Sequence, residues 1–140
     1  MSRQQTFTMI KPDATTANHI GAILHMYETK GLKVLALKKT ILSKSDAETF
    51  YAVHKERSFF RELIDFITSG PVILIALEGE NAVALVREIM GHTDPQKAAE
   101  GTIRNLFAKT IDANAVHGSD SHENAAIELA FFFSKRDLIN

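Results

Sequence analysis

The run Val72-Ile73-Leu74-Ile75-Ala76-Leu77 decides the fold, because it is an unbroken apolar stretch of strand length. A turn at Ser69-Gly70-Pro71 precedes it, and Gly79 is expected to end it. A continuous apolar run between such turn signals predicts a central strand that is covered on both faces. The other elements of the chain are placed around this strand.

Before this run, two strands flank one helix. Thr6–Ile10 alternates as a strand does, and the proline of Lys11-Pro12-Asp13 ends it, which leaves Lys11 at the carboxyl end of the strand. A helix is expected after Asn18 with Gly31 as its stop, and Leu32–Ile41 is the second strand. The buried helix positions are Ile20, Ile23, Leu24 and Tyr27, and the solvated lysines of the strand are Lys33, Lys38 and Lys39.

A helical insertion separates the second strand from the central one. Ser45 and Glu48 form a capping-box pattern that opens a helix, and a break follows at residues 55–58. The next short helix carries one apolar stripe, formed by Phe60, Leu63, Ile64 and Ile67. Phe59 lies off that stripe, so it is either free to meet a ligand or packed against the preceding helix.

Beyond the central strand, a helix is expected over residues 81–90, with Gly91 as its cap and Arg87 on its flank. Periodicity weakens over residues 92–113, where one or two short helices fit around Gly101. A last helix spans residues 122–133, started by Asp120 or Ser121. Its inward positions are expected to be Ala126, Leu129, Ala130 and Phe133.

The order of elements predicts an α+β fold. Without the helical insertion and the C-terminal helix, it matches the ferredoxin-like βαββαβ plan, an antiparallel sheet with helices on one face. We expect a single domain over residues 1–140.

The composition is that of an ordinary soluble protein, with 45% hydrophobic residues and a formal net charge of -1. The absence of cysteine excludes disulfides and thiolate metal sites. Residues 1–5 lack the apolar run of a signal peptide, and no stretch approaches the roughly 18 apolar residues of a membrane span. We therefore expect a cytoplasmic protein with no membrane partner and no requirement for nucleic acid.

The stretch Asn114-Ala115-Val116-His117-Gly118-Ser119-Asp120-Ser121 carries the chemistry. It places one imidazole at the end of a short strand beside a helix N-terminus, where backbone N–H groups favour anions. His117 is either a nucleophile or a hydrogen-bonded structural residue. Walker and glycine-rich nucleotide motifs are absent, so side chains would have to hold a phosphate.

The chain resembles the nucleoside diphosphate kinases, in particular the short bacterial type. The resemblance rests on seven blocks in the family's order: Phe7-Thr8-Met9-Ile10-Lys11-Pro12-Asp13, Tyr51-Ala52-Val53-His54, Phe59-Phe60, Thr68-Ser69-Gly70-Pro71, Leu77-Glu78-Gly79-Glu80-Asn81-Ala82-Val83, Gly101-Thr102-Ile103-Arg104 and Asn114–Ser121. It implies ping-pong exchange of the terminal phosphoryl group between ATP or GTP and diphosphates such as GDP or ADP. It also implies a homo-oligomer, either a dimer or a tetramer.

The resemblance implies a role for each site residue. His117 would form a pros-phosphohistidine, with Glu128 holding its other ring nitrogen, Ser119 bonding to Glu128 or near the histidine, and Lys11 assisting. From the residues alone, Glu128 is equally well a partly buried acid paired with a lysine. The nucleotide-binding residues would be Lys11, Tyr51, His54, Phe59, Leu63, Arg87, Thr93, Arg104, Ile111 and Asn114. Mg²⁺ would be carried by the nucleotide and would contact Asp120 only indirectly.

Two other functions compete with this interpretation. A metal-dependent hydrolase would use a cluster drawn from His92, His117, Asp120, His122 and Glu123. A non-enzymatic ferredoxin-like binding module would not need the set of Lys11, Arg87, Arg104 and His117.

Overall fold

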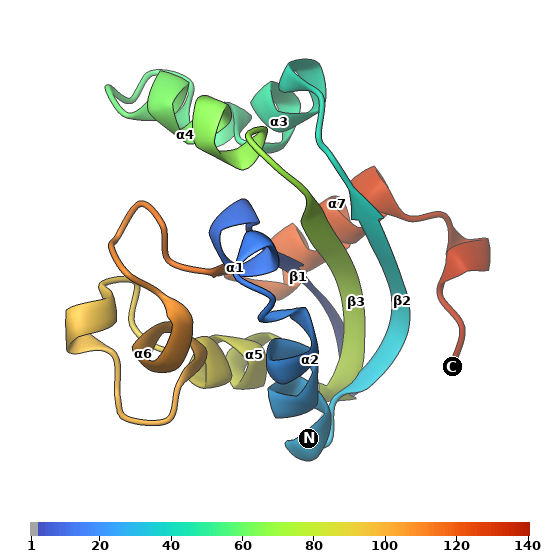
Figure 1. The fold of residues 1–140 in the computed structure, drawn as a ribbon. Coiled ribbons are helices and arrows are strands. Elements are labelled where there is room, and N and C mark those ends of the chain that lie inside the picture. Colours follow the sequence, from blue (N-terminus) through green and yellow to red (C-terminus); the bar gives the residue numbers. More distant parts are fainter. Residues whose placement is uncertain (1–2) are drawn as a thin grey trace.

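The computed structural model describes residues 3–140 and contains one antiparallel sheet in the order β2-β3-β1-β4 (Figure 1). Met1 and Ser2, which belong to the stretch in which no signal peptide is predicted, lie outside the described residues. The strands are β1 (Arg3–Ile10), β2 (Lys33–Thr40), β3 (Val72–Glu80) and β4 (Val116–Gly118). This order confirms the ferredoxin-like α+β prediction.

Helices connect and cover these strands. They are α1 (Pro12–Thr16), α2 (Ile20–Thr29), α3 (Lys44–Phe50), α4 (Phe60–Ile67), α5 (Ala82–Met90), α6 (Ile103–Phe107) and α7 (His122–Phe132). Short 3-10 turns complete the chain at η1 (Ala52–His54), η2 (Pro95–Lys97) and η3 (Lys135–Asp137). Within residues 3–140, every helix is too short or too polar to cross a bilayer.

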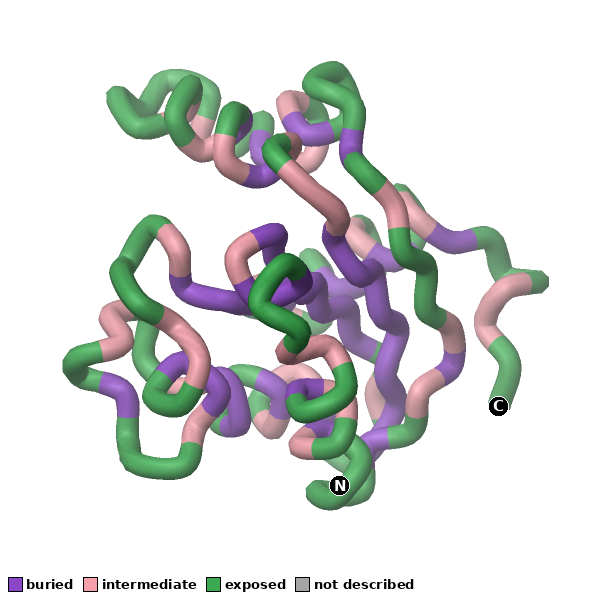
Figure 2. The backbone as a smooth tube through the Cα atoms, in the orientation of Figure 1, coloured by how far each residue is buried: buried purple, intermediate pink, exposed green. Residues whose placement is uncertain are grey.

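The central strand β3 has a core on each side, as its apolar run predicts. Ile73, Ile75 and Leu77 pack toward α2 and α5, whereas Leu74 and Ala76 pack with residues of α3, α4 and α7. Successive strand residues point to opposite faces, so both cores require apolar side chains from the same run. In Figure 2 the buried residues accordingly follow β1 and β3, whereas most residues of the edge strand β2 are half-buried or exposed.

Two helices begin differently from the sequence prediction. Pro12 opens the short helix α1 directly after β1, because its fixed φ suits the first helical position. Ser43, not Ser45, caps α3 by accepting a hydrogen bond from the Asp46 amide. Either serine can act as an N-cap. Because β2 ends at Thr40 and the helix begins at Lys44, Ser43 is the serine that directly precedes it.

Two further expectations about element limits and faces are wrong. Strand β3 continues through Gly79 to Glu80, because β1 pairs with it as far as Arg3. In α7 the buried residues are Ala125 and Leu129, whereas Ala126 and Ala130 are exposed. Ala125 and Ala126 follow one another in the sequence, so the spacing of the alanines alone does not decide which of the two faces the core.

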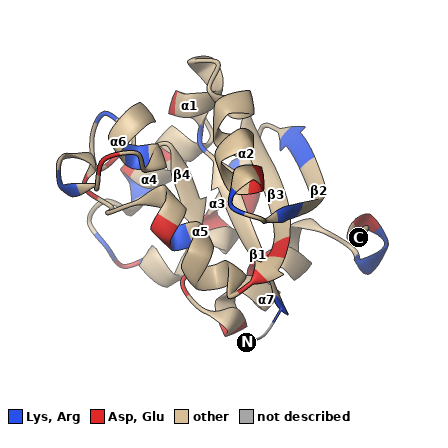
Figure 3. Cartoon of the chain, turned by 90° about the horizontal axis from the view of Figure 1, so that it is seen from below, with Lys and Arg blue, Asp and Glu red and all other residues tan. Residues whose placement is uncertain are grey.

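Charged residues are mixed over the molecule, as the net charge of -1 suggests. Lys and Arg alternate with Asp and Glu in the view of Figure 3. Lys33, Lys38 and Lys39 on β2 are exposed, which confirms their solvated positions.

Candidate active site

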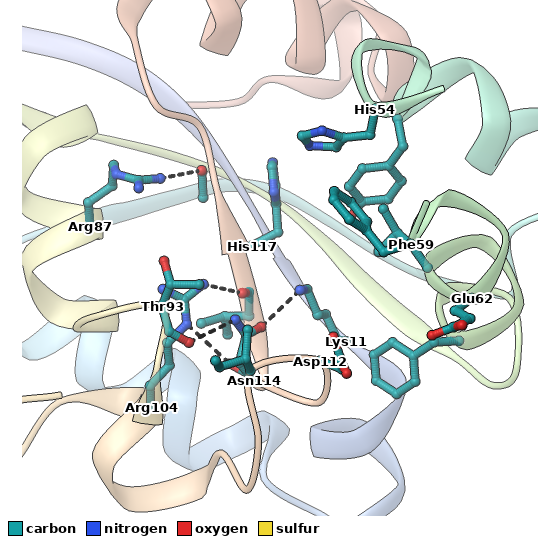
Figure 4. Close-up of a pocket in the computed structure, with 16 residues that line it drawn as sticks. Lys11, His54, Phe59, Glu62, Arg87, Thr93, Arg104, Asp112, Asn114 and His117 are labelled. Atoms are coloured by element: carbon teal, nitrogen blue, oxygen red, sulfur yellow. Dashed lines mark hydrogen bonds between the residues drawn. The ribbon is translucent and has the colours of Figure 1, made fainter. Parts of the chain in front are cut away.

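A cavity of about 580 Å³ opens beside His117, between the α3–α4 hairpin and the long segment that carries α6 (Figures 1 and 4). All ten residues predicted to bind nucleotide line it. They are Lys11, Tyr51, His54, Phe59, Leu63, Arg87, Thr93, Arg104, Ile111 and Asn114. The sequence analysis did not single out Glu62, Phe66, Asp112, Val116 and Gly118, which also line the cavity.

Strand pairing places His117 at the floor of the cavity. His117 lies in β4 opposite Met9 of β1, and its carbonyl accepts a hydrogen bond from Thr8 Oγ1 at 2.7 Å. Its ring packs at 5.9 Å from the Phe7 ring and 5.2 Å from the Phe50 ring. The backbone is therefore fixed by the sheet and the ring by aromatic neighbours, which limits the directions in which the imidazole can point.

One ring nitrogen of His117 is held and the other is left for a ligand. Nε2 lies 3.0 Å from Oε1 of Glu128, and the same oxygen accepts a hydrogen bond from Ser119 Oγ at 2.7 Å. Both side chains of the His–Glu pair are largely covered, with exposed fractions of 21% and 19%. Glu128 thus pairs with His117 and, among residues 3–140, with no lysine, so Nδ1 is the nitrogen available for chemistry.

Lys11 brings a buried cation to the cavity wall. Its Nζ donates to Asn114 Oδ1 at 2.9 Å, and Asn114 Nδ2 donates to the Thr93 carbonyl at 3.2 Å. Burial, followed by the charge of Arg104, lowers the pKa of Lys11 to about 8. The chain Lys11–Asn114–Thr93 joins three segments that are far apart in the sequence.

Arg104 lines the cavity and also binds backbone carbonyls of the segments that form its wall. Its guanidinium donates to the carbonyls of Gly91, Asn114 and Val116 at 3.0, 3.3 and 2.8 Å. Three of its five N–H groups are used in this way, which leaves two for an anion. Burial and the charge of Arg87 lower the pKa of Arg104 to about 10, so it remains a cation at neutral pH.

Arg87 and Tyr51 complete the polar wall around His117. Arg87 donates to the Gly118 carbonyl at 3.0 Å, one residue beyond the histidine. The hydroxyl of Tyr51 is buried and has no hydrogen-bond partner among residues 3–140, and burial raises the pKa of Tyr51. A buried hydroxyl without a partner is costly, and an oxygen of a bound ligand would satisfy it.

The outer part of the cavity is apolar. Phe59 lies at the start of α4, 43% exposed, with its ring 5.5 Å from the His54 ring. Leu63 and Ile111 line the same part of the cavity. Of the two interpretations of Phe59, the structure favours an aromatic ring that is free to meet a ligand.

Asp120 lies on the other side of His117, where it lines a second hollow of about 500 Å³ together with Glu128. Its Oδ1 accepts a hydrogen bond from Asn124 Nδ2 at 2.6 Å, and this bond lowers the pKa of Asp120. The exposed, ionised carboxylate suits a hard cation that brings most of its other oxygen ligands with it.

The cluster required by a metal-dependent hydrolase does not form. Residues 3–140 contain no group of three or more His, Asp or Glu side chains placed to hold a metal ion. His92 instead accepts the amide N–H of Asp94 through Nδ1 at 2.9 Å. Of the two carboxylates that line the hollow beside His117, Glu128 is hydrogen-bonded to the imidazole and to Ser119, so Asp120 is the one that suits a cation carried by a ligand.

Comparisons with known proteins agree with one another. The family model described as nucleoside diphosphate kinase matches residues 4–138. A nucleoside diphosphate kinase of Campylobacter hominis is 62% identical over 135 residues, covering 96% of this chain and 98% of the relative. One of Chlamydia muridarum is 56% identical over 137 residues, covering 98% and 97% of the two chains.

Solved structures show the same likeness. The nucleoside diphosphate kinase of Aquifex aeolicus matches with a TM-score of 0.96 and 40% identity, covering 99% of this chain and 100% of that one. A halophilic nucleoside diphosphate kinase from Halobacterium salinarum, solved in complex with CDP, matches with a TM-score of 0.95 and 40% identity. That match covers 99% of this chain and 93% of the other.

Proposed function

The chain belongs to the nucleoside diphosphate kinase family of phosphotransferases, and we propose that it works by a Mg²⁺-dependent ping-pong mechanism through a pros-phosphohistidine at His117. The observation that carries this proposal is the hydrogen-bonding of one imidazole ring. Glu128 occupies Nε2 at 3.0 Å, and Nδ1 remains available beside a cavity lined by cations.

The first half-reaction transfers a phosphoryl group to the enzyme. The lone pair of Nδ1 on neutral His117 attacks the terminal phosphorus of ATP. A P–N bond forms, the P–O bond to the β-phosphate breaks, and ADP leaves with the bonding electrons. Glu128 stabilises the Nε2–H of the resulting cationic ring, and Ser119 keeps that carboxylate in place.

The second half-reaction reverses the first with another diphosphate. An oxygen of the terminal phosphate of GDP or another acceptor attacks phosphorus, the P–N bond breaks, and Nδ1 recovers its lone pair. Because both halves use one cavity and one nitrogen, the donor leaves before the acceptor binds. The CDP bound in the relative from Halobacterium salinarum supports a diphosphate as a ligand of this fold.

The cavity residues divide into phosphate, sugar and base contacts. Lys11 and Asn114 would bond the sugar hydroxyls, and Phe59 would stack on the base while Leu63 and Ile111 close the slot. Lys11 would also bind phosphate oxygens, together with Arg87, Thr93 and Arg104, and Tyr51 and His54 would line the same pocket. Cations placed where charge develops lower the barrier to phosphoryl transfer.

Asp120 would be the protein carboxylate nearest to Mg²⁺ carried by the nucleotide. The ion, when bound, neutralises phosphate charge and so eases attack by the imidazole. As further parts of the proposal, the enzyme acts in the cytoplasm and as a homodimer or homotetramer. It needs neither a membrane nor nucleic acid.

One labelling experiment tests the mechanism. The purified protein is incubated with Mg²⁺ and ATP labelled in the terminal phosphate, and free nucleotide is then removed. The proposal expects a protein-bound label that is labile in acid, stable in alkali and discharged by GDP. A folded protein that binds ADP yet acquires no label would overturn the mechanism and favour the binding-module alternative.

A further inference from the structure

One face of α4 supplies a carboxylate to the part of the cavity where a base would stack. Phe59, Glu62, Leu63 and Phe66 follow the spacing i, i+3, i+4 and i+7, and all four line the cavity. Residues with this spacing share one side of a helix. Glu62 therefore lies beside Phe59 and Leu63, and Figure 4 labels Glu62 and Phe59 among the side chains that line the cavity.

Glu62 differs from the neighbouring acids in having no cation to neutralise it. On the same hairpin, Asp65 pairs with Lys44 at 2.8 Å and Glu48 pairs with Arg61 at 3.2 Å. Glu62 forms no side-chain hydrogen bond or ion pair among residues 3–140. Its carboxylate therefore has two oxygens available as acceptors at the edge of the cavity.

The charges of the cavity are divided between its two ends. Lys11, Arg87 and Arg104 surround the end near His117, where the charge of Asp112 acts on Lys11, whereas Glu62 lies with the apolar side chains of α4. This arrangement orients a nucleotide with its phosphates toward the cations. The Watson–Crick edge of a stacked base points away from the sugar, so it is presented to the outer end of the cavity, where Glu62 lies.

We propose that Glu62 is a specificity-determining residue that accepts hydrogen bonds from the Watson–Crick edge of the base and so favours guanine nucleotides. This inference rests on the proposed function, because it assumes that the base occupies the slot formed by Phe59, Leu63 and Ile111. Stacking on these side chains alone would discriminate poorly among bases. The carboxylate adds a directional contact to that stacking.

The chemistry of the bases explains the preference. Guanine presents two adjacent donors, N1–H and the 2-amino group, which match the two oxygens of one carboxylate. Hypoxanthine keeps N1–H but lacks the amino group. Adenine presents an acceptor at N1, and uracil and thymine flank their single N–H with two carbonyl oxygens, which repel a carboxylate.

Binding of GDP and inosine diphosphate to the full-length protein tests the inference without requiring turnover. The two ligands differ only in the 2-amino group, so the ratio of their dissociation constants isolates that contact. We expect GDP to bind about fivefold more tightly, the lower end of the discrimination found for bidentate contacts, because Glu62 is exposed. In Glu62→Gln the ratio should fall to near one.

Two acidic positions serve as controls. Asp112 lines the opposite wall of the cavity, and its charge acts on Lys11 by raising that pKa against the effect of burial. Asp112→Asn should therefore retain the wild-type ratio even where it changes the affinity for both ligands. Glu100 is exposed and lies away from the cavity, so Glu100→Gln should alter neither the dissociation constant of GDP nor that of inosine diphosphate.

Equal ratios in the wild-type protein and Glu62→Gln would overturn the role of Glu62. A further outcome is that the labelling experiment fails while the ratio of the GDP and inosine diphosphate dissociation constants still depends on Glu62. That result would overturn the phosphohistidine mechanism and support base recognition. A folded wild-type protein that binds neither diphosphate would overturn both proposals.

Discussion

Ser119 and Glu128 are joined by a hydrogen bond of 2.7 Å, which ends on the same carboxylate oxygen that faces His117. Ser119 is fully buried at the end of β4, whereas Glu128 comes from the second turn of α7. The bond therefore fixes a helix side chain against the sheet. The orientation of the imidazole depends on this contact between two elements.

Replacement of Glu128 should slow enzyme phosphorylation without unfolding the protein. In Glu128→Ala the Nε2–H loses a charged acceptor, a contact worth about 1.5–3 kcal/mol, so the rate should fall by roughly one to two orders of magnitude. Rapid-quench measurement of label incorporation from ATP gives this rate. Ser119→Ala should produce a smaller loss in the same direction, and a normal rate in Glu128→Ala would contradict a positioning role.

His117→Ala should abolish phosphoryl transfer and preserve the fold, because it removes Nδ1 while the backbone pairing of β4 remains. Nucleotide binding should persist, since the other cavity residues are unchanged. The matched control is His25→Ala, an exposed histidine of α2 that should keep full activity. Substantial label on the His117→Ala protein would show that another residue is the nucleophile.

Phe59→Ala should weaken the binding of all nucleoside diphosphates, by about 1–3 kcal/mol, because it removes one stacking surface. Titration calorimetry with ADP measures the loss. Leu106→Ala, which truncates an exposed apolar residue outside the cavity, should have no effect. Unchanged affinity combined with a large loss of turnover would assign Phe59 to chemistry instead of binding.

Nucleotide affinity should fall as the pH rises through the pKa of Lys11, about 8, because deprotonation removes a cation from the cavity. Between pH 7 and 9 the loss is up to about tenfold if only the protonated form binds, and it is smaller if the deprotonated form also binds. Lys11→Arg should flatten the profile. A wild-type dissociation constant that stays constant over this range would contradict the assignment.

The same group should affect stability with the opposite sign. The pKa of Lys11 lies near 8 in the folded protein and near 10.5 when unfolded, so the unfolded chain binds more protons between these values. The contribution of Lys11 to the free energy of unfolding therefore increases with pH over that interval. Denaturant unfolding of the wild-type protein, compared with Lys11→Arg from pH 8 to pH 10, measures the trend.

Asp13→Ala should destabilise the segment that leads into β4. Asp13 Oδ2 accepts the amide N–H of Ala115 at 3.1 Å, and Ala115 is fully buried with φ of 74°. Loss of that acceptor leaves a buried N–H without a partner, at a cost of about 1–3 kcal/mol. Asp13→Asn keeps an acceptor and should lower the free energy of unfolding by less. If Asp13→Ala were as stable in urea as the wild-type protein, the contact would not contribute to stability.

The sequence by itself determined the elements whose signals are local. The apolar run at Val72–Leu77 is sufficient for a strand with two covered faces, and Gly31 and Gly91 both adopt the positive φ expected where a helix ends. The family resemblance implied ten nucleotide-binding residues, and all ten line one cavity. Such elements can be predicted from the sequence because backbone geometry and side-chain periodicity depend on only a few neighbouring residues.

Only the tertiary structure decided which of these residues meet and which atoms they present. Lys11 and Asn114 are 103 positions apart, and Glu128 faces His117 through Nε2 because α7 packs across β1. The inward face of α7 and the choice of Ser43 as a cap depended on packing and on the end of a neighbouring strand. Glu62 was overlooked although it has helical spacing from Phe59, since spacing reveals a shared face but not the cavity in front of it.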